Sequence, residues 1–90
     1  MTYHVPEHVV FREIDDTVVA LNLNTGNYYT LNEVGSRIWI MLYSNKTSDD
    51  VVDQILSEYD VTSEVVEQDL AHLLEELTKN DLIVETRNTS

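Results

Sequence analysis

The histidines are the first residues whose type and spacing could support chemistry. His4 and His8 stand four positions apart, a spacing at which two imidazoles on one face of a helix can hold zinc. Pro6 lies between them and disfavours a helix there. His72 is the remaining histidine and lies far away in the sequence. We therefore expect no metal site.

Adjacent carboxylates could act as an acid and base pair, but three such pairs have simpler explanations. Asp15-Asp16 fits a tight turn between two apolar segments, and Asp49-Asp50 fits the first turn of a helix. Glu75-Glu76 falls in a helical segment, where consecutive side chains diverge. The chain has no cysteine, and Gly26 and Gly35 are too few for a phosphate-binding loop. We predict a protein that is not an enzyme and needs no cofactor.

Composition and charge exclude further classes. A hydrophobic content of 42% indicates a folded protein, and 90 residues fit one domain, residues 1–90. The net charge of −12 argues against binding nucleic acid or anionic membranes, because both require clustered cations. No apolar run is long enough to span a bilayer, and the first residues do not resemble a signal peptide. We expect a cytoplasmic protein.

The first third of the chain predicts a β-meander. Alternation and β-branched residues predict strands at 9–14, 17–23 and 27–31. Asp15-Asp16 would form the first turn, and Asn24-Thr25-Gly26 would form the second, with Gly26 free to adopt a positive φ. No strand follows the third one, so its outer edge is predicted to be open.

Helical periodicity then replaces alternation. Asn32 is a suitable N-cap for the first helix, Thr47 or Ser48 for the second, and Thr62 for the third and longest. Asn80 is predicted to end the third helix, since asparagine tolerates the left-handed conformation. Residues 82–84 would form a short strand or a clasp on the core. Residues 1–8 would form an extended lead-in, and residues 87–90 are expected to fray.

A three-stranded antiparallel meander followed by three helices predicts an α+β fold of winged helix-turn-helix type. DNA-binding proteins of this shape insert the last helix into the major groove. Here that helix and its flanks carry Glu64, Glu67, Asp69, Glu75 and Glu76 but a single Lys79, so phosphate would repel it. We expect the architecture without the DNA-binding function.

The open strand edge beside the third helix predicts a peptide-binding groove. The strand would offer main-chain N–H and C=O groups from Tyr28 to Leu31, and an extended peptide could add a further strand there. The helix carries an apolar stripe, of which Leu70, Leu74 and Leu77 are expected to be mostly buried. Its groove-lining residues are expected to be Val66, Asp69 and Leu73. The alternative is that this stripe belongs entirely to the core.

A set of short runs is distributed along the chain. They are Val5-Pro6, Val10-Phe11-Arg12, the run from Leu21-Asn22-Leu23-Asn24-Thr25-Gly26-Asn27-Tyr28-Tyr29-Thr30-Leu31-Asn32 to Trp39, Thr47, Val51-Val52, Ile55, Glu58-Tyr59-Asp60-Val61, Asp69-Leu70, Leu73-Leu74 and Leu77. Together these runs resemble the PqqD-like family, the recognition elements for ribosomally synthesised and post-translationally modified peptides (RiPPs). The resemblance covers residues 5–84, the expected core of the domain.

The resemblance implies a non-catalytic winged-helix domain that binds the leader segment of a precursor peptide and presents it to a maturation enzyme. Members of the family pair the leader with the third strand and pack it on the third helix. The peptide-binding residues implied for this chain are Asn27, Tyr28, Tyr29, Thr30, Leu31, Val66, Asp69, Leu70 and Leu73.

The hairpin sequence is similar to that of stand-alone subunits of lasso-peptide systems, which work with a separate leader peptidase. Lasso-peptide biosynthesis is therefore the first expectation. Another peptide-maturation system, such as that for pyrroloquinoline quinone, is the second. A winged-helix domain that binds a folded protein partner is the alternative from a different functional class.

Overall fold

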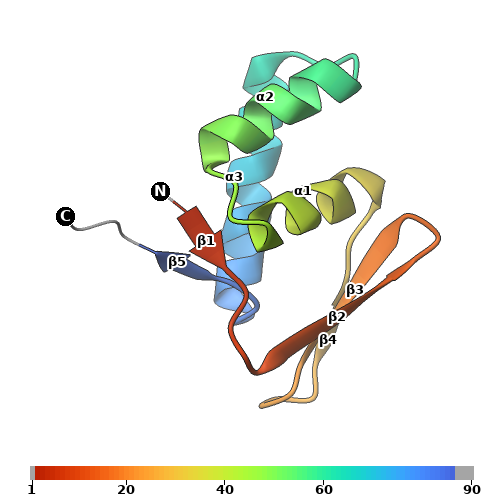
Figure 1. Ribbon diagram of the computed structural model, residues 1–90, viewed down its shortest axis with the longest axis vertical. Helices are drawn as coiled ribbons and strands as arrows, with labels where there is room; N and C mark the ends of the chain where they lie inside the picture. Colours follow the sequence, from red (N-terminus) through yellow and green to blue (C-terminus); the bar gives the residue numbers. More distant parts are fainter. Residues whose placement is uncertain (1, 87–90) are drawn as a thin grey trace.

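The computed structural model describes residues 2–86 and has a three-stranded antiparallel sheet followed by three helices. The sheet order is β2-β3-β4, with β2 at Val9–Ile14, β3 at Thr17–Asn22 and β4 at Tyr28–Thr30. The helices are α1 (Glu33–Tyr43), α2 (Ser48–Glu58) and α3 (Ser63–Lys79). In Figure 1 the sheet lies below α1, and α2 lies above it. The predicted α+β fold is confirmed.

A second sheet, which the sequence analysis did not predict, joins the two ends of the described chain. β1 (Thr2–His4) pairs antiparallel with β5 (Val84–Thr86). Each strand has three residues, too few for alternation to identify it. Leu82 and Ile83, just before β5, are fully buried, which confirms the predicted clasp on the core. Residues 87–90, which were expected to fray, lie outside the described residues.

Both hairpin turns use the residues predicted for them. Asp15 and Asp16 have φ values of 49° and 67°, and positive φ at both central residues is the mark of a type I′ turn. Gly26 has φ 78° in the second turn. The first turn fixes the β2–β3 register, in which Ile14 lies opposite Thr17.

The predicted N-caps are confirmed, with Thr47 rather than Ser48 capping α2. The side-chain oxygens of Asn32, Thr47 and Thr62 accept hydrogen bonds from the third residue beyond each of them, at 2.7, 3.1 and 3.3 Å. Asn80 is the C-cap of α3, so the predicted helix end is confirmed, but the left-handed conformation expected at Asn80 is not found there. Asn80 has φ −90°, and the left-handed residue is Asp81, with φ 58°. The Asn80 N–H still donates to the Glu76 carbonyl (3.1 Å), so the turn to the left-handed conformation comes one residue later.

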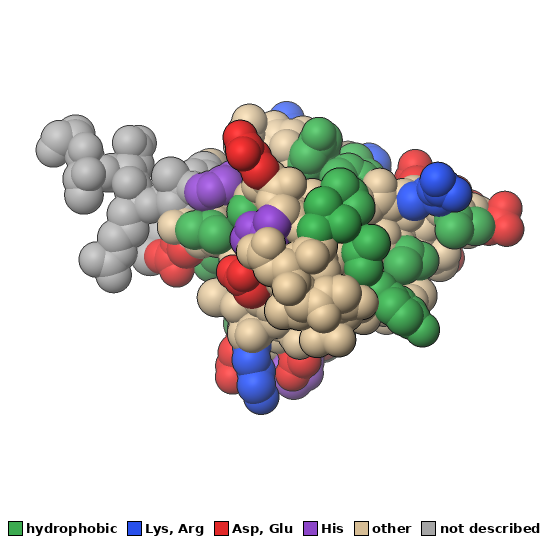
Figure 2. Space-filling model, turned by 90° about the horizontal axis from the view of Figure 1, so that it is seen from below, with side chains coloured by type: hydrophobic (Ala, Val, Ile, Leu, Met, Phe, Trp, Pro, Cys, Tyr) green, Lys and Arg blue, Asp and Glu red, His purple; other side chains and the backbone are tan. Residues whose placement is uncertain are grey.

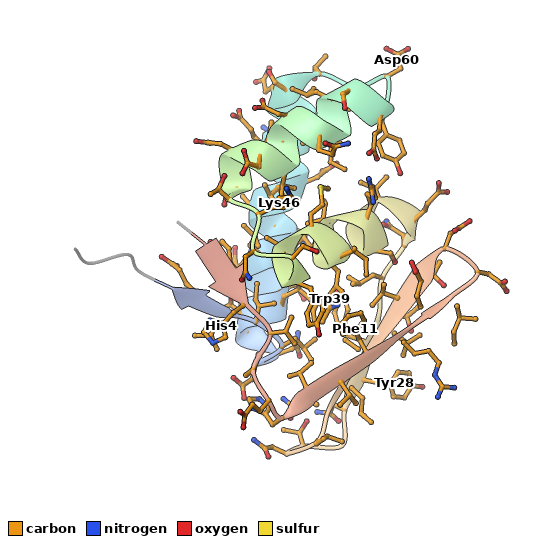
Figure 3. All side chains as sticks on the ribbon, in the orientation of Figure 1. His4, Phe11, Tyr28, Trp39, Lys46 and Asp60 are labelled. Atoms are coloured by element: carbon orange, nitrogen blue, oxygen red, sulfur yellow. The ribbon has the colours of Figure 1, made fainter. Side chains whose placement is uncertain are left out.

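The core has two parts. One lies between the sheet and the helices around Trp39 and Leu77, and the other lies among the three helices around Leu42 and Ile55. Phe11 of β2 packs edge-on against Trp39 of α1, with ring centroids 5.5 Å apart (Figure 3). Among the described residues, no helix combines the length and apolarity that crossing a membrane requires.

The two faces of the three-stranded sheet differ sharply. Val18, Ala20 and Asn22 of β3 face the helices and are buried. The outer face carries every other residue, and two of its apolar members, Val10 and Tyr28, are 46% and 73% exposed. Figure 2 shows hydrophobic side chains gathered on this side of the molecule. The outer-face positions are Val10, Arg12, Ile14, Thr17, Val19, Leu21, Tyr28 and Thr30.

Candidate functional site

A groove of about 550 Å³ opens beside the end of β4. It is bounded by four parts of the chain: β4 with its continuation into α1, the first half of α1, the end of α2 with the following loop, and one side of α3. The lining residues are Tyr29, Thr30, Leu31, Asn32, Val34, Gly35, Ile38, Ile55, Tyr59, Val61, Val65, Val66, Asp69, His72, Leu73 and Glu76.

The strand edge beside the groove has free main-chain groups. Two ladder bonds set the pattern of pairing: the Asn22 N–H donates to the Asn27 carbonyl and the Leu31 N–H donates to the Val18 carbonyl, both at 2.9 Å. In an antiparallel pair, residues whose main-chain groups face the partner strand alternate with residues whose groups face away. Asn27, Tyr29 and Leu31 therefore face β3.

Tyr28 and Thr30 consequently direct their N–H and C=O groups to the open edge. β4 pairs only with β3 among the described strands, so no strand covers these groups. An extended segment placed there could form alternating hydrogen bonds with both residues. Its inward side chains would then enter the groove between β4 and α3.

Ser36 fixes the junction at which β4 becomes α1. Its buried hydroxyl accepts a hydrogen bond from the Val18 N–H at 2.7 Å and donates to the Leu31 carbonyl at 3.3 Å. The hydroxyl thus bridges the Val18 N–H and the Leu31 carbonyl, while the Leu31 N–H donates directly to the Val18 carbonyl, and it ties α1 to the sheet. As a result the strand leads directly into the helix, and Asn32, Val34 and Gly35 lie at the groove beside the strand edge.

The end of α2 is held by an ion pair outside the groove. Arg37 of α1 donates two hydrogen bonds to the Glu58 carboxylate, at 2.9 and 2.7 Å, and Gln54 donates a third at 2.6 Å. The hydrogen bonds from Arg37 and then Gln54 lower the pKa of Glu58 to about 2. This pair joins α1 to the last turn of α2, next to the groove residue Tyr59.

The groove walls are mainly apolar. Val66 is buried at 5% exposure and forms the floor, whereas Val61 and Val65 are 41% and 46% exposed near the α2–α3 loop. Leu73 is half-buried further along α3. Apolar side chains left exposed around a concave surface favour binding of an apolar ligand group.

Six of the residues assigned from the sequence line this groove: Tyr29, Thr30, Leu31, Val66, Asp69 and Leu73. Asn27 and Tyr28 lie instead at a small hollow of about 20 Å³ near Asn80. Leu70 is buried at 4% exposure in the helical core, and Leu77 is fully buried. These two burial predictions are confirmed, whereas Leu74 is only half-buried.

The sequence analysis did not assign the far wall of the groove. Val51, Ile55 and Tyr59 stand at helical spacing and form an apolar stripe on α2. No local pattern shows that the end of this stripe turns toward β4. For Val61 and Val65, in contrast, the sequence does indicate a position outside the core. Val61 is an apolar residue in a polar loop, and Val65 widens the stripe of α3 beyond what core packing requires.

The groove lining has few ionisable side chains. Within residues 2–86 there is no group of three or more histidine and acidic side chains that could hold a metal ion. The groove offers one imidazole and two carboxylates, all on α3, with apolar surface around them. An extended main chain with apolar side chains matches this arrangement.

The fold and the site define a class: an α+β winged-helix domain whose open strand edge forms one wall of an apolar groove. Residues 17–83 match the family described as "Coenzyme PQQ synthesis protein D (PqqD)". The chain belongs to this family, and the match confirms the PqqD-like RiPP recognition element identified from the hairpin sequence.

Two solved structures are similar over nearly the whole chain. "TbiB1 in Complex with the TbiA(beta) Leader Peptide" has 40% sequence identity and a TM-score of 0.88, covering 98% of this chain and 100% of that one. "Lasso peptide synthetase B1 complexed with the leader peptide" has 25% identity and a TM-score of 0.86, covering 94% and 100%. A search of curated protein sequences found no match.

Proposed function

We propose that this protein captures the leader segment of a ribosomally synthesised precursor peptide and presents it to a maturation enzyme. The observation that carries the proposal is the free edge of β4 beside the 550 Å³ groove. It is supported by the likeness to TbiB1, a protein 40% identical that is in complex with a leader peptide.

Capture would occur by β-augmentation on β4. The leader pairs with the outward main-chain groups of Tyr28 and Thr30, which sets its register. Alternate leader side chains then point toward α3 and enter the groove over Val66 and Leu73. Ordering a flexible leader costs free energy, so a few buried apolar or aromatic anchors would supply most of the affinity.

The proposed role is non-catalytic. To present the bound leader to a maturation enzyme, the protein needs a second surface on which that enzyme can dock. The outer face of the three-stranded sheet fits this need, because Val10, Ile14 and Tyr28 are exposed there. None of its eight positions is acidic, although the chain has 17 acidic residues. A strand added to β4 would extend this face, so an enzyme docked on it would contact the bound leader as well.

The maturation enzyme is proposed to be a leader peptidase of lasso-peptide biosynthesis, since one similar structure is a lasso peptide synthetase B1. The family description leaves a system for pyrroloquinoline quinone as the alternative. Either role places the protein in the cytoplasm, where a ribosomally made precursor is available.

The test is a fluorescence-polarisation titration with the labelled leader of the precursor gene that neighbours this one, and a scrambled leader as the control. Val65→Glu is the informative variant, because Val65 lines the groove and is 46% exposed. Val66→Glu is less useful, since Val66 is buried and a carboxylate there would destabilise the fold.

We expect saturable binding of the native leader alone and weaker binding to Val65→Glu. Val10→Glu is the matched control, since Val10 has the same 46% exposure but lies on the outer sheet face. Absence of leader binding by the folded protein would reject the capture role. The exposed outer face would then favour the alternative of a folded protein partner.

A further inference from the structure

The α3 wall of the groove alternates acidic and apolar side chains. Going along the helix, Val66 is followed by Asp69, then by Leu73, then by Glu76, and all four line the groove. Asp69 and Glu76 are separated by two helical turns, or about 10 Å along the axis. Asp69 is exposed and Glu76 is half-buried.

No cation balances these two carboxylates within the described part of the chain. Arg37 is engaged with Glu58, and His8 contacts the Asp81 carboxylate through its Nε2. His72, between the two carboxylates, is the one histidine among the lining residues. None of the lysines and arginines of residues 2–86 lines the groove: Arg12, Arg37, Lys46 and Lys79.

A peptide strand on β4 would bring every second side chain to this wall. Side chains alternate between the two faces of a strand, so those facing α3 are separated by two or four positions. Val66 and Leu73 would receive apolar side chains, and the neighbouring Asp69 and Glu76 would receive side chains from the same face of the peptide. A bound peptide also excludes water from this wall, which strengthens attraction to a cation and repulsion of an anion.

We propose that Asp69 and Glu76 are specificity determinants that select leader segments carrying a lysine or arginine two or four positions from an apolar anchor. The same carboxylates reject segments with an acidic residue at that position, because like charges would be brought together. This inference rests on the proposed function, since it names the leader chemistry that the groove accepts.

The first experiment is a selection from a display library of random twelve-residue peptides on the immobilised full chain. We expect the selected peptides to combine an apolar or aromatic residue with lysine or arginine at an even spacing of two or four. Selection on Asp69→Lys should shift the preference at that position to aspartate or glutamate. Glu67→Lys is the matched control, because Glu67 is exposed on the same helix and does not line the groove.

The second experiment measures the affinity of one selected peptide and of its versions with alanine or glutamate in place of the basic residue. For the basic peptide, Asp69→Asn and Glu76→Gln should each weaken binding about two- to fivefold, as expected for a single partly exposed ion pair. Glu67→Gln should leave the affinity unchanged. The effects of Asp69→Asn and Glu76→Gln should disappear for the alanine peptide and decrease at high salt.

The outcomes separate this inference from the function on which it rests. Selected peptides that bind through apolar anchors, with no preference for charge and no response to Asp69→Lys, would overturn the specificity and leave leader capture standing. A selection that yields no peptide whose binding is weakened by Val65→Glu would overturn both. Circular dichroism of each variant, compared with the native protein, shows whether a loss reflects unfolding.

Discussion

The side chain of Asn22 connects the β3–β4 hairpin to the end of α3, where its Nδ2 donates a hydrogen bond to the main-chain carbonyl of Asn80 at 3.3 Å. The same nitrogen lies 3.4 Å from the Asp81 carbonyl. The Asn22 Oδ1 accepts hydrogen bonds from the Asn24 and Thr25 N–H groups, at 2.9 and 3.3 Å. One buried amide thus shapes the turn before β4 and holds it against the helix that forms the opposite groove wall.

We predict that Asn22→Ala destabilises the protein and weakens leader binding. Removing the buried amide of Asn22 breaks these part-buried hydrogen bonds together, at a cost of about 1–3 kcal/mol in the free energy of unfolding. Urea unfolding measures this loss, and Asn24→Ala, at an exposed position of the same hairpin, is the control. Leader affinity that is unchanged in the folded fraction of Asn22→Ala would limit the role of this contact to stability.

Thr30→Pro tests the use of the strand edge directly. The Thr30 N–H faces away from β3, so proline there spares the β3–β4 ladder and removes one donor from the open edge. We expect leader affinity to fall by about fivefold or more, equivalent to ~1 kcal/mol, with little change in stability. Tyr29→Pro should behave differently, because the Tyr29 N–H faces Ala20 of β3 and its loss should destabilise the sheet.

Leader binding that is unaffected by Thr30→Pro would contradict β-augmentation on β4. Circular dichroism and urea unfolding of the two proline variants would show whether the sheet survives in each.

The Arg37–Glu58 pair predicts a specific loss of stability in acid. The hydrogen bonds from Arg37 and Gln54 lower the pKa of Glu58 from 4.5 to about 2, so the pair stabilises the fold above pH 4.5. That contribution is lost as the pH falls from about 4.5 through about 2, where the folded carboxylate takes up its proton. Urea unfolding of the native protein and Glu58→Gln should therefore differ at pH 6 and converge toward pH 2.

Glu67→Gln is the control for this prediction, because it removes one charge from an exposed position of α3. Equal differences between the native protein and Glu58→Gln at pH 6 and pH 2 would show that the ionised form of Glu58 contributes nothing to stability.

Local patterns predicted the elements of this fold because each one carries its own signal. The bounds of β2, the two turns and the three N-caps depend on residues close in sequence, such as Asp15-Asp16 and Asn32. The β1–β5 pairing depends on contact between the two ends of the described chain, and neither three-residue strand has a pattern of its own. The left-handed conformation of Asp81 was missed because the neighbouring Asn80 has the higher local propensity for that conformation.

The walls of the candidate site also differ in whether local sequence could predict them. Its β4 and α3 walls could be predicted from the open edge and the apolar stripe. The α1 and α2 walls could not, because they depend on how the helices pack. Ile38 and Ile55 read as core residues, and they are buried, but each also lines the groove. A residue on the boundary between core and groove has the same periodicity as a residue wholly inside the core.

The outer sheet face yields the last prediction, which separates leader binding from leader removal. Val10 and Ile14 are 46% and 48% exposed on this face and do not line the groove. If a leader peptidase docks there, Val10→Glu and Ile14→Glu should each lower the rate of leader cleavage by about five- to thirtyfold, as for residues central to an interface. Leader affinity in fluorescence polarisation should remain that of the native protein.

Val84→Glu is the control for this prediction. It changes an exposed valine of β5 and should alter neither the cleavage rate nor the leader affinity. Cleavage that follows leader affinity alone, with both outer-face variants processed at the native rate, would show that the enzyme contacts another surface.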